Sequence, residues 1–402
     1  MDPHEFRDSP AGRLVKAQGE YWAFVPNPLP PSIAWSSELV STLSEADRAI
    51  GELAGLGRLM SNPHLLIRPL IRREAVFSSR IEGTQASLSD LFTYEAVQLS
   101  LFDLPDDVRE VHNYVRALEY GLERMRDFPL SLRLIREIHA VLMEGVRGET
   151  KTPGEFRRSQ NWIGTPGATL SEASYVPPPV SEMWKALDAF EKFLHAPSPL
   201  PPLIRIGLIH YQFEAIHPFL DGNGRVGRLL ITLLLYAWDL LPSPLLYLSP
   251  YFEAHRAEYY ARLRAVSSQG AWEAWLLFFL QGVAMQAEDA VDRIKRLQAL
   301  RARYRAVLQD TRASARLLRV LDLLFEKPVL QTRQVQTALD LPNFATAQRY
   351  LDRLREMGIV REITGKARNR VYRADEILAV LEHPESGEAP EPKEDDQGET
   401  IP

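Results

Sequence analysis

The chain contains 402 residues, of which 45% are hydrophobic and 25% are charged, and its formal net charge is −6. This length predicts roughly two to four folded units, and the composition excludes a collagen-like, a disulfide-scaffold or a wholly disordered protein. The absence of cysteine excludes thiolate metal sites, thiol nucleophiles and disulfides. No apolar stretch reaches the ~18 residues of a membrane helix, and residues 1–6 show no secretory signal. We therefore expect a cytoplasmic protein that does not enter a membrane.

The negative charge is confined to the end of the chain. Residues 383–402 hold seven acidic side chains and one lysine, and the preceding residues hold 46 basic and 46 acidic side chains. The terminal segment is rich in Pro, Gly and Glu and has no aromatic residue. Because such a segment cannot bury enough apolar surface to order itself, we predict a disordered acidic tail.

The apolar periodicity of residues 1–310 predicts an almost wholly helical structure. A first helix is expected to begin near Ser44, whose hydroxyl can cap it. Further helices are predicted at residues 64–78, 111–126, 132–143, 180–194, 202–217, 223–240, 250–268 and 272–303. Between two of these helices, the Gly- and Pro-rich residues 151–179 predict a loop with short extended pieces.

Residues 311–382 have a different character. The helical runs 314–326, 332–339 and 343–357 precede two short β-like segments, 359–364 and 370–373. Three helices followed by a basic hairpin are typical of a winged helix-turn-helix. The segment holds 13 basic and 9 acidic side chains and so carries +4, which leaves −4 on residues 1–310.

Basic side chains of this segment fall where such a domain contacts phosphates. They are Arg349, Arg353 and Arg355 on the third helix and Lys366, Arg368 and Arg370 in the hairpin. DNA binding is therefore one hypothesis for the domain. A module for protein contacts is the alternative, since winged helices also serve in that role.

One stretch combines features that suit a bound phosphate: residues 216–230, with the sequence IHPFLDGNGRVGRLL. Gly222 and Gly224 flank Asn223, and both glycines are free to take a positive φ. Successive backbone N–H groups can then turn inward as an anion nest. The nest opens an apolar helix, whose N-terminal N–H groups and dipole favour a phosphate.

The side chains of the same stretch suggest a chemistry. Arg225 and Arg228 lie three residues apart on one helix face, where their guanidinium groups could hold phosphate oxygens. Asp221 is a hard oxygen ligand suited to Mg²⁺. His217 is the only nearby group that titrates near neutrality. Together these residues indicate a phosphate cradle, a metal ligand and a base.

The run HPFLDGNGRVGR at residues 217–228 resembles HPFx(D/E)GNGRxxR, the signature of the Fic domain, at every fixed position. Fic proteins mostly transfer AMP from ATP to a hydroxyl of a protein. Residues 151–179 resemble the family's flap, which holds the target segment by strand addition, and residues 250–280 resemble the helices that close over the adenine. The resemblance covers roughly residues 20–290. It implies an all-α fold: a Fic-type helical domain with a small β-hairpin flap, followed here by the winged helix-turn-helix domain.

A second motif lies further towards the N-terminus. Residues 78–83, SSRIEG, fit the inhibitory motif (S/T)xxxE(G/N) of Fic proteins, with Ser78, Glu82 and Gly83 as the fixed points. The resemblance implies that Glu82 can pair with Arg228 and occupy the space that the ATP γ-phosphate needs. ATP would then bind out of line for attack, and activity would fall through lost alignment.

The resemblance also implies a role for each site residue. His217 would take the proton from a Ser, Thr or Tyr hydroxyl of the target, and Asp221 would hold Mg²⁺ at the phosphates. Arg228 would hold the γ-phosphate when Glu82 is displaced. The residues expected around the nucleotide are Asp221, Gly222, Asn223, Gly224, Arg225, Val226, Gly227, Arg228, Ile163, Gly164, Tyr259 and Ser267.

These patterns predict an autoinhibited protein adenylyltransferase that uses ATP and Mg²⁺ and modifies an unidentified target protein and itself. We expect an N-terminal helical region with the inhibitory helix, a catalytic domain, a linker helix with the winged domain, and the acidic tail, at residues 1–105, 106–290, 291–382 and 383–402. The alternatives are a de-AMPylase in which Glu82 positions a water, a DNA-binding regulator whose Fic domain senses nucleotide, and a metal-dependent hydrolase built on His210, Glu214 and His217. A homodimer is a further open arrangement.

Overall fold

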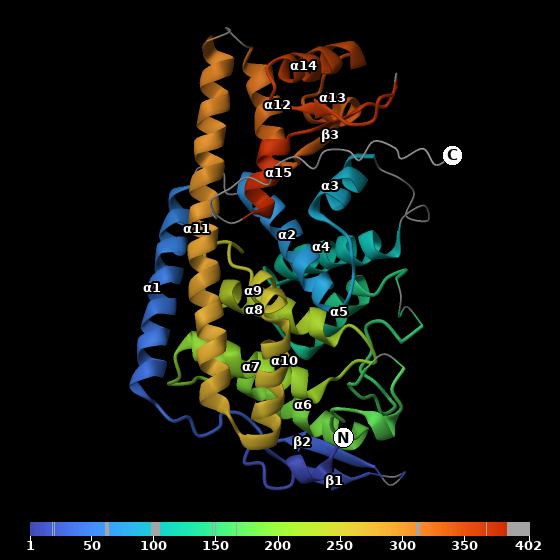
Figure 1. Ribbon diagram of the computed structural model, residues 1–402, viewed down its shortest axis with the longest axis vertical. Helices are drawn as coiled ribbons and strands as arrows, with labels where there is room; N and C mark the ends of the chain where they lie inside the picture. The colour runs from blue at the N-terminus through green and yellow to red at the C-terminus, as the bar shows by residue number, and fades with distance from the viewer. Residues whose placement is uncertain are drawn as a thin grey trace, which may run out of the picture.

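A computed structural model of the protein describes residues 1–17, 19, 21–60, 64–97, 105–146, 148, 150–165, 167–310, 314–366 and 368–383, with the side chains of His64 and Asp310 outside the description. Figure 1 shows an elongated, mostly helical molecule whose N-terminal hairpin and C-terminal domain lie at opposite ends. One large apolar core of buried side chains connects the hairpin, the helices between and the C-terminal domain.

The described residues form two small antiparallel sheets and a series of helices. In chain order the elements are η1 (Pro3–Glu5), β1 (Gly12–Lys16), β2 (Trp22–Pro26), α1 (Ser37–Leu59), α2 (His64–Ile81), α3 (Leu88–Val97), α4 (Asp106–Arg124), α5 (Leu132–Leu142), η3 (Leu170–Glu172), α6 (Val180–His195), α7 (Pro202–Ile216), α8 (Asn223–Ala237), α9 (Ser249–Ala254), α10 (Arg256–Gln269), α11 (Trp272–Asp310), α12 (Ala315–Glu326), β3 (Val329–Gln331), α13 (Thr332–Ala338), α14 (Phe344–Glu356), β4 (Arg361–Glu362), β5 (Val371–Arg373) and α15 (Asp375–Glu382).

The N-terminal hairpin of β1 and β2 was not predicted. The rings of Phe6, Phe24 and Tyr175 pack against one another, and the Phe24 N–H donates to the Val176 carbonyl at 2.9 Å. The strands are short and half-buried, and their alternation is too brief to stand out from the helical pattern. The hairpin supports the end of the loop 151–179, which leads back towards the site.

The first long helix begins earlier than the sequence suggested. Helix α1 starts at Ser37, so the predicted start near Ser44 was wrong. The Oγ of Ser36 caps it and accepts the Leu39 N–H at 3.1 Å. Leu39 and Leu43 are both buried, which shows that the apolar stripe facing α11 extends towards the N-terminus from Ser44.

Most of the other predicted helices are confirmed with shifts of a few residues at their ends. Helix α3 was missed, because its residues have little periodic contrast. The predicted helix 250–268 is divided into α9 and α10 at His255, whose ψ of +33° departs from the helical value.

Helices α7 and α8 lie at the centre of the molecule. Nearly every residue of α7 is buried, and so is most of α8 from Asn223 to Leu235. Helix α8 packs on α7 and also on α2, α4 and α5. A helix that is apolar on all sides must be covered on all sides. The connecting residues 217–222 are therefore held between two elements that cannot shift freely.

Helix α11 runs alongside α1 for much of the length of the molecule (Figure 1) and crosses residue 290 without a break. It contacts α7, α9 and α10 at one end and α12 and α15 at the other. One part of this helix thus falls in the predicted catalytic domain and the other part in the predicted linker. The proposed domain boundaries themselves stay predictions.

The C-terminal domain contains the three predicted helices and the predicted hairpin. Its order is α12, β3, α13, α14, β4, β5 and α15, and the sheet has the antiparallel order β3-β5-β4. Strand β3 and helix α15 were not predicted. The assignment of this domain as a winged helix-turn-helix stays a prediction. Residues 384–402 of the predicted tail lie outside the described residues.

The C-terminal domain packs directly on α2 and α3. Arg68 of α2 forms an ion pair with Glu326 of α12, with 3.0 Å between Nη1 and Oε2. Gln334 of α13 donates from Nε2 to the carbonyl of Glu95 in α3 at 3.1 Å. The helix that carries the inhibitory motif therefore lies between the C-terminal domain and α8. Within the described residues no helix has both the length and the apolar character to span a bilayer.

Trp275 of α11 provides a test of the core. Its ring is fully buried and its Nε1 donates to the Gly207 carbonyl of α7 at 2.9 Å. We predict that Trp275→Ala lowers the free energy of unfolding by about 3–5 kcal/mol, because it leaves a large cavity in the core. Urea denaturation followed by circular dichroism measures this loss. Trp184→Ala, at a half-exposed position, is the control, and an equal loss in both variants would contradict the packing.

Candidate active site

His217 adopts a left-handed backbone conformation at the end of α7. Its φ is +49° and its ψ is +61°, a region that costs a non-glycine residue about 1–2 kcal/mol. Its N–H donates to the Phe213 carbonyl at 3.0 Å. Its own carbonyl accepts hydrogen bonds from Arg157 Nε at 3.0 Å and from Asn161 Nδ2 at 3.1 Å. These bonds hold the turn that leads the chain from α7 into residues 218–222.

The imidazole of His217 is set up as a neutral base. Its Nδ1 lies 3.2 Å from the Glu214 carbonyl, which assigns the ring hydrogen to Nδ1 and leaves Nε2 as an acceptor. Burial lowers the pKa of His217 to about 4, and the positive charge of Arg157 acts in the same direction. At neutral pH the ring is therefore uncharged and able to accept a proton.

The loop after His217 is closed by Asn223. Its Oδ1 accepts the Phe219 N–H and its Nδ2 donates to the Phe219 carbonyl, each at 2.8 Å. Gly222 takes the positive φ of +76° that the nest prediction required. Gly224 does not; it lies in the first turn of α8, so the prediction of two left-handed glycines was wrong for this position. Its lack of a side chain serves to leave space, as the contacts of Glu82 show.

Asp221 is anchored through its backbone and leaves its carboxylate accessible. The Gly222 N–H donates to Asp221 Oδ1 at 2.7 Å. His139 Nε2 donates to the Asp221 carbonyl at 3.0 Å, while His139 Nδ1 accepts the Gly154 N–H at 2.8 Å. The His139 ring also stacks on Phe219 with 3.7 Å between the ring centroids. His139 was not identified from the sequence, because a lone histidine within a helical run carries no motif.

The surroundings of Asp221 fit a Mg²⁺ ion that is shared with a substrate. The side chain is 43% exposed, and the described residues contain no group of three His, Asp or Glu side chains that could hold a metal by itself. Mg²⁺ is usually bound by one or two carboxylates together with substrate phosphates and waters. A single accessible carboxylate beside a helix N-terminus suits that mode.

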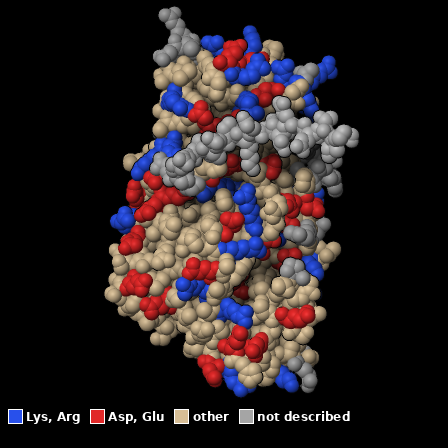
Figure 2. Space-filling view, in the orientation of Figure 1, with Lys and Arg blue, Asp and Glu red and all other residues tan. Residues whose placement is uncertain are grey.

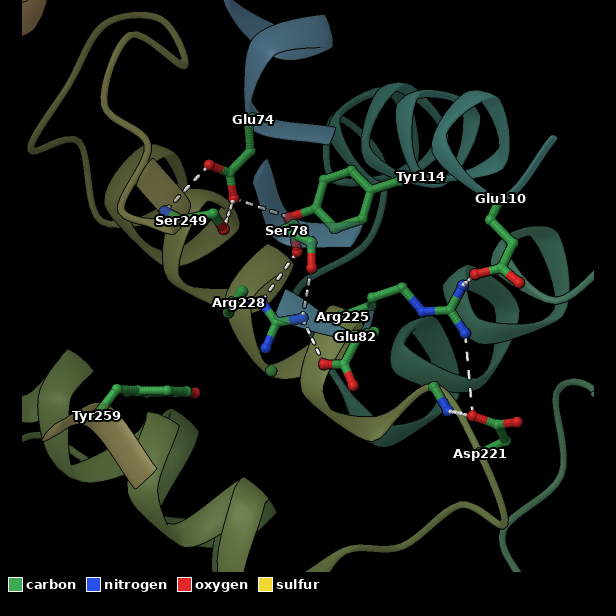
Figure 3. A network of polar contacts seen from close by, with 12 residues as sticks. Glu74, Ser78, Glu82, Glu110, Tyr114, Asp221, Arg225, Arg228, Ser249 and Tyr259 are labelled. Atoms are coloured by element: carbon green, nitrogen blue, oxygen red, sulfur yellow. Dashed lines mark hydrogen bonds and ion pairs between the residues drawn. The ribbon is translucent and has the colours of Figure 1, made fainter. Parts of the chain in front are cut away.

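Arg225 is buried and engaged with acidic groups. Its Nη1 lies 3.3 Å from Glu110 Oε2, and its Nη2 lies 3.9 Å from Asp221 Oδ1 (Figure 3). Glu110 of α4 is itself 1% exposed. This carboxylate, which the sequence analysis did not single out, orients Arg225 beside Asp221. The proposed phosphate contact of Arg225 stays a prediction.

Arg228 is the centre of a second set of contacts, which come from α2 and from Glu82 in the turn that follows it. Its Nε donates to Ser78 Oγ at 2.9 Å, and its Nη2 donates to the Ser78 carbonyl at 2.9 Å and to Glu82 Oε1 at 2.6 Å (Figure 3). The structure thus forms the pair of Glu82 and Arg228 that the motif implied. Burial opposes ionisation of both groups. Their mutual attraction outweighs it, so that the pKa of Glu82 is lowered and that of Arg228 is raised.

Glu82 lies directly against the phosphate-binding turn. A Cβ atom added to Gly224 would clash with Glu82 Oε1 and with Arg228 Nη1. Gly83 follows in the left-handed region with a φ of +100° and ends α2. The carboxylate therefore occupies space at the first turn of α8, where a nucleotide phosphate would bind.

A buried acidic residue one helical turn before Ser78 was missed. Glu74 accepts hydrogen bonds from Tyr114 Oη at 3.0 Å, from Ser249 Oγ at 2.5 Å and from the Ser249 N–H at 3.2 Å (Figure 3). Glu74 and Ser78 share one face of α2, and Glu82 follows at the same spacing of four residues. The spacing is readable from the sequence. The partners are not, because they come from α4 and α9.

Glu214 is a second acidic group near Arg228. Its Oε1 has no hydrogen-bond partner among the described residues, and a Cβ atom on Gly227 would clash with it. Burial raises the pKa of Glu214 to about 7, against the opposing charge of Arg228 and with a contribution from Glu82. The position thus holds a carboxyl group that changes charge near neutral pH.

The predicted flap residues lie at the surface. Ile163 and Tyr175 form one antiparallel bridge, with the Ile163 N–H donating to the Tyr175 carbonyl at 2.9 Å. Within the described residues the expected β-hairpin is reduced to this bridge. Trp162 and Ile163 are 41% and 38% exposed. Residues 162–164 are thus the exposed edge of the flap, and the binding of a target strand there stays a prediction.

Tyr259 and Ser267 are buried and do not line an exposed surface of the site. Tyr259 Oη lies 2.8 Å from His210 Nε2, and Ser267 Oγ lies 2.8 Å from Tyr211 Oη. Val226, also expected near the nucleotide, is fully buried. The structure brings together the motif residues with Ser78 and Glu82; the nucleotide contacts of Tyr259 and Ser267 stay predictions.

The metal-hydrolase alternative finds no support in the contacts of His210. Both ring nitrogens are occupied: Nδ1 lies 3.0 Å from the Gly227 carbonyl and Nε2 faces Tyr259. Burial lowers the pKa of His210 to about 3. Among the described residues no group of three potential ligands gathers around it.

Comparison with known protein families agrees with this geometry. Residues 40–123 match the family described as Fic/DOC family N-terminal, and residues 129–235 match the Fic/DOC family. The motif at 217–228 falls in the second region and the motif at 78–83 in the first. Both motifs therefore lie in regions that match Fic/DOC family models.

Several curated relatives are described as protein adenylyltransferases. Proteins described as "Protein adenylyltransferase Fic" are 31% identical over 133 residues in Drosophila erecta, 28% over 211 in Drosophila willistoni and 30% over 196 in Aedes aegypti. These matches cover 32%, 50% and 47% of this chain. The chain spans only 25%, 40% and 36% of the respective relatives, so their activity as whole proteins is carried over here only as a proposal.

Solved structures support the fold. A Fic family protein from Desulfovibrio desulfuricans G20 aligns with a TM-score of 0.55 at 20% identity and covers 86% of this chain and 98% of its own. A fragment of Fic-1 from C. elegans aligns with a TM-score of 0.50 at 19% identity and covers 64% of this chain and 74% of its own. At these identities the likeness is one of fold.

Glu214 predicts a pH dependence of stability. Its folded pKa of about 7 lies above the ordinary value of 4.5, so its stabilising contribution is complete below pH ~4.5 and is lost as the pH rises through 7. We predict that Glu214→Gln gains stability relative to the parent between pH 5 and pH 8, by on the order of 1–3 kcal/mol. Urea denaturation at both pH values measures the change, and a pH-independent difference would contradict it.

Proposed function

We propose that the protein is an autoinhibited protein adenylyltransferase, which transfers AMP from ATP to a Ser, Thr or Tyr hydroxyl of a target protein and of itself. The observation that carries the proposal is the position of Glu82: it is paired with Arg228 and packed against Gly224, at the start of the helix that follows His217. The names of the curated relatives support the donor and the reaction. We place its action in the cytoplasm.

The chemistry follows from the arrangement of the chain's own groups. His217 Nε2 accepts the proton of the target hydroxyl while its oxygen bonds to the α-phosphorus of ATP. The bond from that phosphorus to the bridging oxygen of the β-phosphate breaks, and pyrophosphate leaves. Asp221 would hold Mg²⁺, which neutralises charge on the phosphates. The first-turn N–H groups of α8 have no acceptor within the helix and can receive phosphate oxygens.

Inhibition follows from competition for Arg228. Its guanidinium is 2% exposed and already donates to Ser78 and to Glu82. A γ-phosphate could take the place of the Glu82 carboxylate, because both are anions that a guanidinium binds through paired N–H groups. While Glu82 remains in place, the triphosphate cannot align its α-phosphorus for attack.

The first prediction of this proposal concerns Glu82. We predict that Glu82→Gly raises self-labelling from α-labelled ATP by about tenfold or more, because the space and the guanidinium are released for the γ-phosphate. Intact-mass analysis after incubation with ATP and Mg²⁺ measures AMP additions. Glu123→Gly, at an exposed end of α4, is the control.

The double variant Glu82→Gly with His217→Ala completes this test. It loses the base and is expected to show no AMP addition. Full labelling in the double variant would refute the role of His217, and unchanged labelling in Glu82→Gly would refute inhibition by Glu82.

The reverse reaction uses the same groups. Glu82 is held ionised by Arg228, and an ionised carboxylate near the α-phosphorus could orient a water for removal of AMP. Incubation of the labelled Glu82→Gly protein with the parent chain distinguishes the directions. Loss of label would assign de-AMPylation to the parent, whereas retained label leaves transfer as its reaction.

We propose DNA binding as a second function, located in the C-terminal domain. Its α12, α15 and β3 pack on the body, whereas the main packing partner of α14 is α13 of the same domain. Arg349 and Arg353 of α14 are exposed, as are Lys366 and Arg368 between β4 and β5. Figure 2 shows Lys and Arg side chains at this end of the molecule, with Asp and Glu side chains among them. The face that reads DNA in winged helices is thus open and basic.

This second function predicts a salt-dependent gel shift. The parent chain should retain a duplex of about 30 base pairs at 50 mM salt and lose most of it at 200 mM, since phosphate contacts release counterions. Arg349→Ala with Arg353→Ala should weaken retention about tenfold and flatten the salt dependence. Arg126→Ala with Arg133→Ala, on the body, is the matched control. Absence of retention at low salt would leave protein contacts as the role of the domain.

A further inference from the structure

Arg157 is a buried cation without an acidic partner among the described residues. It is 0% exposed and ranks with the largest fully buried side chains. The ion pairs of the described residues include none of its atoms. A buried charge is costly unless hydrogen bonds replace its hydration. Burial accordingly lowers the pKa of Arg157 to about 10. The hydrogen bonds of Arg157 explain why a buried charge is retained at this position.

The guanidinium of Arg157 donates only to backbone carbonyls, which come from three places in the chain. Nε donates to His217 at 3.0 Å, Nη1 to Ser159 at 3.3 Å and Nη2 to Pro178 at 2.5 Å. The Arg157 N–H adds a bond to the Pro218 carbonyl at 2.9 Å. Arg157 thus joins the two ends of the segment 159–178, which includes the flap edge, to two consecutive peptide groups. Its side chain bonds to the carbonyl of His217, and its backbone N–H bonds to the carbonyl of Pro218.

A neighbouring side chain reinforces the same attachment. Asn161 Nδ2 donates to the His217 carbonyl at 3.1 Å and to the Phe219 carbonyl at 2.7 Å. Tyr175 Oη donates to the Ala215 carbonyl at 2.8 Å. The flap segment is therefore bonded to the backbone of residues 215–219 by three side chains, of which only Arg157 is charged and reaches both ends of the segment.

His217 needs such support, because its backbone lies in the left-handed region. A residue with a side chain stays there only when its surroundings over-determine the conformation. The His217 N–H is satisfied within α7, so the peptide group that follows His217 is the one that can rotate. Arg157 and Asn161 both hold the carbonyl of that peptide.

We propose that Arg157 is a positioning residue, which locks His217 in its left-handed turn and couples that turn to the flap edge where a target strand would lie. The geometry of the base and the position of the target backbone are then set by one guanidinium. Proper alignment matters, since a displacement of about 1 Å can cost ~10²-fold in rate. The kinetic consequence rests on the proposed adenylyltransferase activity; the effect on His217 itself does not.

The experiment compares Arg157→Gln and Arg157→Lys in the Glu82→Gly background, with Arg133→Gln as the control at an exposed arginine of α5. For Arg157→Gln we expect kcat for AMP transfer to fall roughly 10–100-fold, with the KM for ATP within about twofold because no nucleotide contact is removed. Arg157→Lys keeps the charge but cannot bridge three carbonyls, so its kcat should fall as well.

An NMR titration of the histidine side chains supplies a readout that does not need activity. The His217 signal is assigned by its absence in His217→Ala. The charged groups that influence the pKa of His217 are Arg157 and Glu82. In the otherwise unmodified chain, Arg157→Gln should raise this pKa by roughly 0.5–1 unit. Arg157→Lys should leave it near the parent value.

The outcomes separate the two proposals. If Arg157→Gln folds with the parent's thermal midpoint and keeps the kcat of the Glu82→Gly protein, the positioning role is refuted. If Arg157→Gln does not fold, a kcat in Arg157→Lys equal to the parent's refutes it. If the Glu82→Gly protein transfers no AMP while the His217 signal of Arg157→Lys, which keeps the charge, is displaced from the parent's signal at neutral pH, the adenylyltransferase proposal fails and the positioning role stands.

Discussion

A buried positive charge at the start of α8 organises the catalytic region. Arg228 is almost inaccessible to solvent, and a guanidinium in that position must be paired and hydrogen-bonded. In this structure its partners are Ser78 of α2 and Glu82 in the turn that follows it. The position of α2 is therefore tied to α8, and Glu74 extends the attachment to α4 and α9 through Tyr114 and Ser249. The packing of the rest of α2 therefore holds the motif at residues 78–83 against Arg228.

The catalytic turn depends on a second group of buried contacts. His217 lies in a conformation that a histidine rarely adopts, and the flap segment holds its carbonyl through Arg157 and Asn161. On the other side of the loop, His139 holds the backbone of Asp221. The base and the candidate metal ligand are thus oriented through their backbones, which leaves the imidazole Nε2 and the carboxylate available for chemistry.

The C-terminal domain brings a second surface into contact with the inhibitory helix. The ion pair of Arg68 and Glu326 and the bond from Gln334 to Glu95 join it to α2 and α3. The same domain presents α14 and the β4–β5 hairpin outward with exposed arginines and lysines. Helix α2 therefore contacts both the candidate active site and the C-terminal domain.

The sequence by itself predicted the candidate site residues and most of the helices. The contiguous run from His217 to Arg228 contains its own turn, cap and charges, and Ser78 and Glu82 are four residues apart, so local patterns together with the family resemblance were enough to predict them. The hairpin β1–β2, α3 and the break at His255 escaped prediction, because neighbouring elements rather than local periodicity stabilise them.

Only the tertiary structure decided which partners these residues have. Glu110, His139 and Arg157 lie 60 to 115 positions from their partners Arg225, Asp221 and His217, separations that no local spacing encodes. Gly224 looked like a residue chosen for its backbone freedom, yet the structure shows that it leaves room for Glu82. The physical reason is general: burial of a charge demands a partner, and in a folded chain that partner comes from whichever element packs nearest in space.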